Sequence, residues 1–255
     1  MCRDDRRCEQ ARRLESLSAG ELAPQTAGAP PVVWSDSDLA AVWAEHGRAV
    51  ACAALARVER AGRVDSQVFT AMHAAADQAG ARLHGAEFRL KDPASLTRKI
   101  ADKQGKAQLQ GVSRRADEVA DGITDVCRYT AVTAEHDRIP QTASAVVDRL
   151  RGQGWEVVEA ESSYVAGNPY KGLHLLLREP GGMEVELQVH SEWSQQLKDE
   201  SHLLYERSRA AETPLAQKRD LVARGVALWE GLPAPRGMED LRELGGVRVR
   251  KKTYS

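Results

Sequence analysis

The chain has 255 residues, 29% of them charged, and a formal net charge of −1 at pH 7. This balance excludes a general electrostatic attraction to nucleic acid or to an acidic membrane. No apolar run approaches the length of a membrane span, and the charged start at Arg3 is unlike a signal peptide. Four cysteines without C-x-x-C spacing fit a reducing compartment, with Cys52 and Cys127 as small buried residues. The sequence therefore predicts a cytoplasmic protein with no membrane partner.

The first 35 residues are rich in Arg, Ala, Gly and Pro and predict a flexible arm, with a short basic helix around Cys8–Ser16. Ser35-Asp36-Ser37-Asp38 supplies N-cap candidates where the globular part begins. Apolar residues from Leu39 to Val58 recur at helical spacing, and a second helix is expected from Ser66 to Leu83. Both helices are assigned packing roles.

Cations gather in the next stretch. Glu87–Lys91 reads as an extended segment, in which Arg89 and Lys91 point to the same side. A helix is expected over Ser95–Leu109, with Ser95 and Lys99 on one face. Three cations and a hydroxyl near a helix N-terminus suit a polyphosphate. The alternative is a solvated basic face, which is the commoner meaning of a run of charge.

The second half predicts most of a sheet. Strands are expected over Gly122–Thr133, Trp155–Val165, Leu173–Arg178 and Met183–His190, and helices over Ile139–Gly154, Trp193–Tyr205 and Leu215–Leu232. The basic end at Arg248–Lys252 is expected to be solvated. This alternation favours an α+β or α/β fold with a mixed central sheet flanked by helices. Asp is disfavoured in strands, so the position of Asp125 inside the strand expected over Gly122–Thr133 suggests a functional site, a sheet edge or a cap.

The last predicted strand carries an unusual polar row. Glu184, Glu186, Gln188 and His190 alternate with Val185, Leu187 and Val189, which places the polar side chains on one face. A hairpin with one wet face would show the same alternation. Carboxylates, an amide and an imidazole are poor strand formers, however, and this favours a functional row.

Five motifs occur in one order along the chain. They are R-x-K-x-x-x-S-x-x-x-K (Arg89, Lys91, Ser95, Lys99), a strand Asp (Asp125), N-x-Y-x-x-x-H (Asn168, Tyr170, His174), E-x-Q (Glu186, Gln188) and E-x-H-x-x-Y (Glu200, His202, Tyr205). In this order they resemble the synthetase domain of the RelA/SpoT family of alarmone synthetases, over roughly residues 36–210. The resemblance divides the chain into an arm over 1–35, the synthetase domain over 36–210, and a helix and basic tail over 211–255.

The resemblance implies transfer of pyrophosphate from ATP to the 3′-hydroxyl of a purine nucleotide. Arg89, Lys91, Ser95 and Lys99 would hold ATP, with Arg89 against the adenine. Asp125 would ligate Mg²⁺, and Glu186 would share the metal or act as general base. Tyr170 would stack on the acceptor base. The remaining acceptor residues would be Asn168, Lys171, His174, Gln188 and His190.

Departures from the family pattern lie on the acceptor side. Arg128 and Thr130 stand where the family has Gly and Arg after the strand Asp, and Pro169 and Ala166 replace a Gly and a Lys beside Tyr170. His190-Ser191 stands where long-form synthetases have Arg-Thr. The acceptor is therefore left open among guanine nucleotides, adenine nucleotides and the tRNA 3′ end. An unopposed synthetase drains ATP, so a toxin-like role with an antitoxin or tRNA as partner is expected. The rival interpretations are an inactive nucleotide-binding module and a partner-binding protein.

Overall fold

The computed structural model describes residues 13, 18–35, 38–210 and 212–254, and the helix expected around Cys8–Ser16 lies outside them. The chain divides into two compact units, residues 1–70 with 85–128 and residues 71–84 with 129–255. The boundary expected at residue 210 does not coincide with a boundary between these units. No helix in the described part of the chain is long and apolar enough to cross a membrane.

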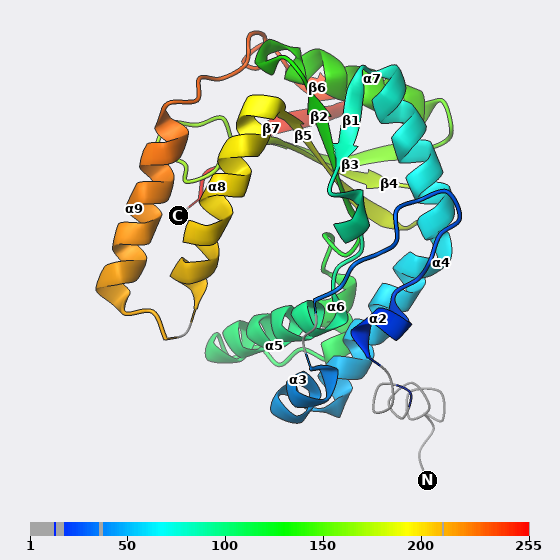
Figure 1. Cartoon of the computed structure of the whole chain (residues 1–255), viewed down its shortest axis with the longest axis vertical. Helices are drawn as coiled ribbons and strands as arrows, with labels where there is room; N and C mark the ends of the chain where they lie inside the picture. The colour runs from blue at the N-terminus through cyan, green and yellow to red at the C-terminus, as the bar shows by residue number, and fades with distance from the viewer. Residues whose placement is uncertain (1–12, 14–17, 36–37, 211, 255) are drawn as a thin grey trace. The chain divides into compact units, whose positions relative to one another are not determined.

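The first unit is helical. Its elements are α2 (Ala19–Leu22), α3 (Leu39–His46), the N-terminal part of α4 (Arg48–Gln78), the 3₁₀ turn η1 (Ala86–Phe88), α5 (Pro93–Leu109) and α6 (Ala116–Asp121). Asp38 caps α3 by accepting hydrogen bonds from the amides of Ala40 and Ala41. Asp92 caps α5 in the same way through the amide of Ser95, and Pro93 occupies the first helical position. In Figure 1, α3, α5 and α6 lie together.

Helix α4 corrects the expectation of a break between Val58 and Ser66. It runs uninterrupted for 31 residues, and a glycine near its middle, Gly62, packs against Pro24. Leu83, expected in a helix, lies instead in a strand, because Gly80 takes a positive φ of 71° directly after the helix and turns the chain.

Two extended segments of the first unit are shorter than expected. Glu87–Lys91 is not a strand: η1 occupies Ala86–Phe88, and Leu90 makes a single antiparallel bridge to Cys127. The strand expected over Gly122–Thr133 begins only at Arg128, so Asp125 lies in a turn that precedes it. A turn tolerates Asp far better than a strand does.

The N-terminal segment is packed rather than a free arm over its described part. The amide of Val33 donates to the carbonyl of Glu87 at 2.8 Å, and the indole of Trp34 donates to the carbonyl of Leu90 at 3.0 Å. Val32 and Trp34 are buried. This segment therefore packs against the stretch of chain that carries Arg89 and Lys91 and is hydrogen-bonded to it.

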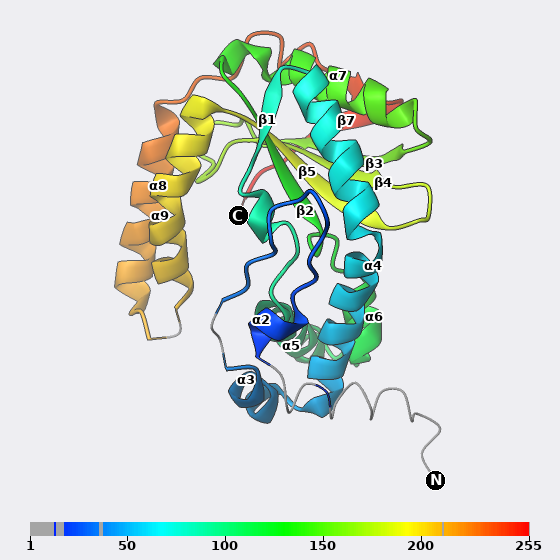
Figure 2. The ribbon, with the colours of Figure 1, turned by 45° about the vertical axis from the view of Figure 1, so that its right-hand side comes forward.

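The second unit is built on a seven-stranded mixed sheet of order β1-β2-β5-β4-β3-β7-β6. The strands are β1 (Ala81–His84), β2 (Arg128–Thr133), β3 (Glu156–Ser162), β4 (Leu173–Arg178), β5 (Glu184–Ser191), β6 (Glu243–Leu244) and β7 (Val247–Lys251). The helices are α7 (Ile139–Arg151), α8 (Glu192–Arg209) and α9 (Leu215–Glu230), with a 3₁₀ turn η2 (His136–Arg138). The protein is α+β, as the sequence predicts, and Figure 1 and Figure 2 show α8 and α9 side by side.

The β4–β5 hairpin forms as expected, because its turn is locked at both ends. The carboxylate of Glu179 accepts hydrogen bonds from the amides of Gly181 and Met183, and Gly182 takes a φ of 94° that favours glycine. On β5, Val185, Leu187 and Val189 are fully buried, and the strand contacts α7. His174 on β4 lies directly opposite Gln188 on β5. The register thus brings the polar residues of the two strands onto a common row.

The basic tail belongs to the sheet, while the side chains of Arg248, Arg250 and Lys251 are exposed, as expected. Gly245 and Gly246 both have positive φ, and they join β6 to β7 in a tight hairpin. β7 then pairs in parallel with β3 from Val249 to Lys251, and the ammonium of Lys252 donates to the carboxylate of Glu161 at 2.6 Å. The tail completes the sheet.

Candidate functional site

A compact cluster of charge forms in the first unit from residues far apart in the sequence. The Nζ of Lys91 lies 3.1 Å from Oδ2 of Asp125, and the Nζ of Lys99 lies 2.8 Å from Oδ1 of the same carboxylate. Asp125 is held in the turn before β2, Lys91 follows η1, and Lys99 stands two turns into α5. The amide of Lys91 donates to the carbonyl of Val126, which fixes the two segments against each other.

This cluster carries an excess of positive charge. Burial pushes the pKa of the Asp125 carboxyl up, but the charges and hydrogen bonds of Lys91 and Lys99 outweigh it and lower the pKa to about 2. Burial lowers the pKa of Lys91 and is the largest effect; attraction to Asp125 opposes it, and repulsion from Lys99 and Arg128 acts in the same direction as burial. Two lysines beside one carboxylate can accept a further anion, which is the chemistry of a phosphate site.

Ser95 lies on the same face of α5 as Lys99, one turn nearer the helix start. Its amide is engaged by the Asp92 cap at 2.9 Å. The helix has 17 residues, so its positive N-terminal end reinforces the cationic character of this face. Of the four residues expected at the ATP site, the structure brings Lys91 and Lys99 together on Asp125 and places Ser95 on α5 with Lys99.

Arg89 takes a different place from the one expected. Its guanidinium is fully buried and forms a bidentate pair with Asp65, in which Nε and Nη2 each lie 2.7 Å from a carboxylate oxygen. Its Nη1 donates to the carbonyls of Pro30 and Ala86. A guanidinium enclosed in this way presents no open face to an adenine ring. Its position immediately before Leu90 makes it a support for the segment that carries Lys91.

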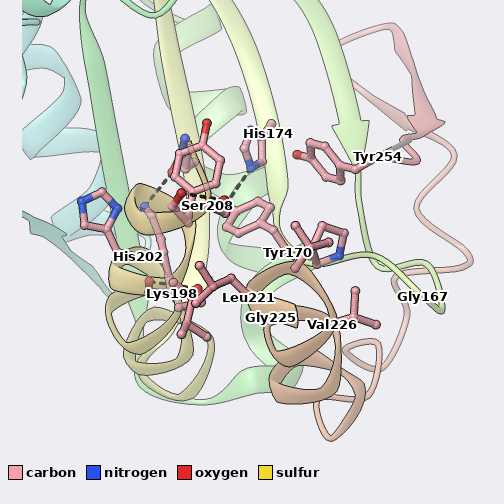
Figure 3. A pocket seen from close by; sticks show the side chains of 16 residues that line it. Gly167, Tyr170, His174, Lys198, His202, Ser208, Leu221, Gly225, Val226 and Tyr254 are labelled. Carbon is pink, nitrogen blue, oxygen red and sulfur yellow. Dashed lines mark hydrogen bonds between the residues drawn. The ribbon is translucent and has the colours of Figure 1, made fainter. Parts of the chain in front are cut away.

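A cavity of about 570 Å³ lies in the second unit, between the polar face of the hairpin and the α8–α9 pair. Its lining comprises Gly167, Pro169, Tyr170, His174, Gln188, Lys198, Ser201, His202, Leu204, Tyr205, Ser208, Leu221, Val222, Gly225, Val226 and Tyr254. Figure 3 shows Tyr170, His174 and Tyr254 on the sheet side, and Lys198 and His202 on the helix side. This volume lies in the usual range for a small-molecule site.

Tyr170 is the centre of an aromatic and imidazole cluster at this cavity. Its hydroxyl lies 2.8 Å from Nε2 of His174 and 2.7 Å from Nε2 of His190, so it donates to one imidazole and accepts from the other. Its ring meets the buried ring of Trp229 edge-on at 5.2 Å between centroids. Gly172 makes this arrangement possible, because a Cβ there would lie 2.7 Å from the Tyr170 hydroxyl oxygen.

Glu186 is held by its neighbours on the same polar row. Its Oε1 lies 3.2 Å from Nδ1 of His174 and accepts a hydrogen bond from the amide nitrogen of Gln188 at 2.9 Å. The other end of the Gln188 amide accepts a hydrogen bond from the ammonium of Lys198 at 2.7 Å. The row thus presents a half-buried carboxylate with an imidazole beside it.

Three of the six residues expected around the acceptor lie behind the cavity. Asn168 is buried and its amide ties Ser163, Lys252 and Tyr254 together. Lys171 donates to the carbonyl of Leu232 at 2.6 Å, and burial lowers its pKa. His190 is fully buried, and this burial, with nearby positive charge, lowers its pKa well below the ordinary value. Tyr170, His174 and Gln188 line the cavity itself.

Sequence reasoning missed Lys198, Gly172 and Tyr254. Lys198 lies one helical turn before His202, and this i, i+4 spacing was the available signal for a shared face. Gly172 stands between the expected Tyr170 and His174, but only the folded distances show why it must lack a side chain. Tyr254 reaches the cavity because β7 pairs with β3, which no local pattern predicts.

No group of three or more His, Cys, Asp or Glu side chains among the described residues is arranged to hold a metal ion by itself. A magnesium ion commonly takes only one or two protein carboxylates, with water and substrate phosphates completing its shell. Asp125 fits that role as a single carboxylate within a cationic cluster.

No protein-family model matches the chain, and no curated protein matches it. Solved structures do resemble it. Small alarmone synthetase 1 from Bacillus subtilis is 16% identical with a TM-score of 0.45, over 68% of this chain and 87% of that protein. The complex of the type VI effector Tas1 with its immunity protein gives 15% identity and a TM-score of 0.41, over 68% and 93% of the chains. A GTP pyrophosphokinase family protein from Streptococcus pneumoniae gives 15% and 0.43, over 73% and 89%. The chain is thus similar, at 15–16% identity, to a small alarmone synthetase, to the type VI effector Tas1 and to a GTP pyrophosphokinase family protein.

Proposed function

We propose that the protein transfers pyrophosphate from ATP to the 3′-hydroxyl of a purine nucleotide. The observation that carries this proposal is the convergence of Lys91 and Lys99 on Asp125, three residues of the ordered motifs that are separated by up to 34 positions. Transfer of phosphoryl groups depends mainly on positioning and on neutralising charge, and this cluster supplies both cations and a carboxylate.

On the donor side, the ammonium groups of Lys91 and Lys99 bind the phosphates of ATP, and Ser95 adds a hydroxyl from the same helix face as Lys99. Arg89 acts indirectly, by holding the segment before Lys91. Asp125 would be the carboxylate that holds Mg²⁺. When bound, the ion neutralises charge that develops on the phosphates.

On the acceptor side, the purine lies in the cavity against Tyr170. The acceptor's 3′-oxygen forms a bond to the β-phosphorus of ATP, the bond between that phosphorus and the α–β bridging oxygen breaks, and AMP leaves. Glu186 accepts the proton of the 3′-hydroxyl, and its contacts with His174 and Gln188 hold the carboxylate in place. Glu186 would also be a carboxylate able to ligate a metal ion.

The test is incubation of the protein and Mg²⁺ with ATP labelled at the γ-phosphate and with GDP, GTP, AMP, ADP or bulk tRNA. The expected result is label attached to at least one acceptor, with adenine nucleotides or tRNA at least as good as GDP. Faster product formation from GDP or GTP than from any adenine nucleotide or tRNA would refute the acceptor preference and leave the reaction type standing.

Glu186→Gln is expected to lower kcat about 10²- to 10⁴-fold through loss of the general base. Glu184→Gln is the matched control, because Glu184 lies two residues away on β5 and contacts Arg178 instead.

If ATP binds but no acceptor is labelled, the protein is an inactive nucleotide-binding module. If ATP does not bind, the motifs are coincidental and a partner-binding role is favoured. An antitoxin partner is part of the proposal, because an unopposed synthetase would drain ATP.

A further inference from the structure

We propose that Lys198 forms the 5′-phosphate subsite of the acceptor cavity. This inference rests on the proposed function and extends it to a residue outside the five ordered motifs. Lys198 lies on α8 and lines the cavity opposite Tyr170 (Figure 3). The lysine that the resembled family has near Tyr170 is absent here, because Ala166 occupies its position. Lys198 can supply the missing positive charge from α8.

The charge of the cavity favours an anion. Among its described lining residues, Lys198 is the one side chain with a fixed charge, and none of the lining residues is Asp or Glu. His174, His202 and the hydroxyls of Ser201 and Ser208 add hydrogen-bonding groups of either sense. A ligand with an apolar, aromatic part and an anionic part matches this lining, and a nucleotide has both.

Lys171 does not supply this cation. It follows Tyr170 in the sequence and was expected among the acceptor residues, but its ammonium is buried and bonded to the carbonyl of Leu232. Lys198 by contrast is half-buried at the wall of the cavity, with its ammonium 2.7 Å from Oε1 of Gln188 and 3.4 Å from Oγ1 of Thr130. An ammonium has three donors on a flexible stem, so it can turn from a weak contact such as Thr130 to a phosphate oxygen while it keeps Gln188.

The contact of Lys198 with Gln188 suggests a second role, the positioning of the general base, which must be separated from phosphate binding. Lys198 could act through Gln188, whose amide nitrogen donates to Glu186, and would then position the general base rather than bind substrate. A phosphate-binding role depends on the number of phosphates on the acceptor. A positioning role does not.

The experiment measures binding of adenosine, AMP, ADP and GDP to the full chain by isothermal titration calorimetry, without ATP. In the wild type, affinity is expected to rise from adenosine to AMP and ADP. Lys198→Gln is expected to reduce the affinity for AMP and ADP about ten- to a hundredfold, with adenosine unchanged, which is the range for a hydrogen bond to a charged group. Lys198→Arg is expected to restore most of the difference. Lys251→Gln, on exposed β7, is the matched control and is expected to change nothing.

Equal weakening of adenosine and ADP by Lys198→Gln would overturn the proposal in favour of the positioning role. Unchanged ADP affinity, or no nucleotide binding by the wild type, would also overturn it. The pyrophosphate-transfer assay separates the two claims. Transfer without a phosphate-dependent effect of Lys198 removes this inference alone, whereas phosphate-dependent binding without transfer removes the reaction and leaves the subsite. Circular dichroism of each variant confirms that it is folded.

Discussion

Arg89 and Asp65 form a bidentate ion pair in which both side chains are fully buried. The pair joins α4 to the segment before Lys91, and Arg89 extends it to the N-terminal segment through the carbonyl of Pro30. Asp65 is also hydrogen-bonded by the hydroxyl of Thr26. The cationic cluster at Asp125 is therefore held in place by Arg89, which the sequence motif assigns to the binding of ATP.

Breaking this pair should strongly destabilise the first unit. Asp65→Asn or Arg89→Ala leaves one buried charge without its partner, which costs about 3–5 kcal/mol. Replacing both residues, as Asp65→Leu with Arg89→Met, should cost less than either single change because no charge is left buried. Urea unfolding measures the three variants. A double variant less stable than both single ones would contradict this account, as would single variants of wild-type stability.

The Asp125 cluster should make stability depend on acid. The lysines lower the pKa of Asp125 to about 2, so the unfolded chain binds this proton more readily than the folded one. The stabilisation is then complete above about pH 4 and is lost as the pH falls towards 2. Asp125→Asn should remove this part of the pH dependence. Parallel pH profiles for wild type and variant, measured by urea unfolding at each pH, would show that the pair with the lysines does not form.

Gly172→Ala should disrupt the Tyr170 cluster. The added Cβ would lie 2.7 Å from the Tyr170 hydroxyl oxygen, 3.0 Å from a His190 carbon and 3.1 Å from a His174 nitrogen. Overpacking of this kind costs about 1–3 kcal/mol.

Gly225→Ala is the control for Gly172→Ala. It adds the same methyl group to a helical position on α9 where no atom lies within 4 Å, and it should be neutral or stabilising by about 0.5–1 kcal/mol. Thermal unfolding compares the two variants. Equal effects would show that the close approach at Gly172 is unimportant.

Tyr170→Phe separates the ring from the hydroxyl. The ring that faces the cavity is kept, but the buried His190 loses a partner at 2.7 Å and His174 one at 2.8 Å, and unfolding should become easier by about 1–3 kcal/mol. Purine binding should fall much less than in Tyr170→Ala, because stacking depends on the ring. Calorimetric binding of AMP and urea unfolding give the two readings. Equal loss of binding in the Phe and Ala variants would contradict a stacking role.

His190 should impose a second pH dependence, in the near-neutral range. Burial lowers its pKa in the folded state, so the unfolded chain binds the proton more readily below the ordinary value of 6.5. Stability from the neutral imidazole is present above that pH and is lost on acidification. His190→Gln should flatten the profile between pH 7 and 5, as measured by urea unfolding. An unchanged slope would indicate that His190 does not remain neutral in the folded protein.

Local pattern predicted the hairpin and the helices α5, α7, α8 and α9 well. The alternation around Glu186 and the Pro180-Gly181-Gly182 turn determine β4 and β5 locally, and the structure has both nearly as expected. The polar row was recognisable because strand formers on β5 are replaced by Glu, Gln and His. These features depend on residues that are close together in the sequence, and they can therefore be predicted from it.

Features that depend on distant partners were predicted poorly. A break was expected between Val58 and Ser66, yet α4 is continuous there, and Asp65 pairs with Arg89. The pairing of the tail with β3 was not expected, although Gly245-Gly246 before the alternating residues 247–250 was a hairpin signal. Arg89 was assigned to ATP from its motif, and only the fold reveals that a buried carboxylate holds it.

The most direct test of the central claim follows the phosphates of ATP. Reactions run in parallel with ATP labelled at the α-phosphate or at the γ-phosphate, with AMP or ADP as acceptor and Mg²⁺ present, and the products are separated by chromatography. Pyrophosphate transfer predicts that the α label appears only in AMP released from ATP. It also predicts that the γ label appears in a new acceptor product in equal amount, and that both signals fall sharply in Glu186→Gln but not in Glu184→Gln. Release of the γ label as inorganic phosphate or pyrophosphate, with no labelled acceptor of any kind, would contradict the proposed reaction.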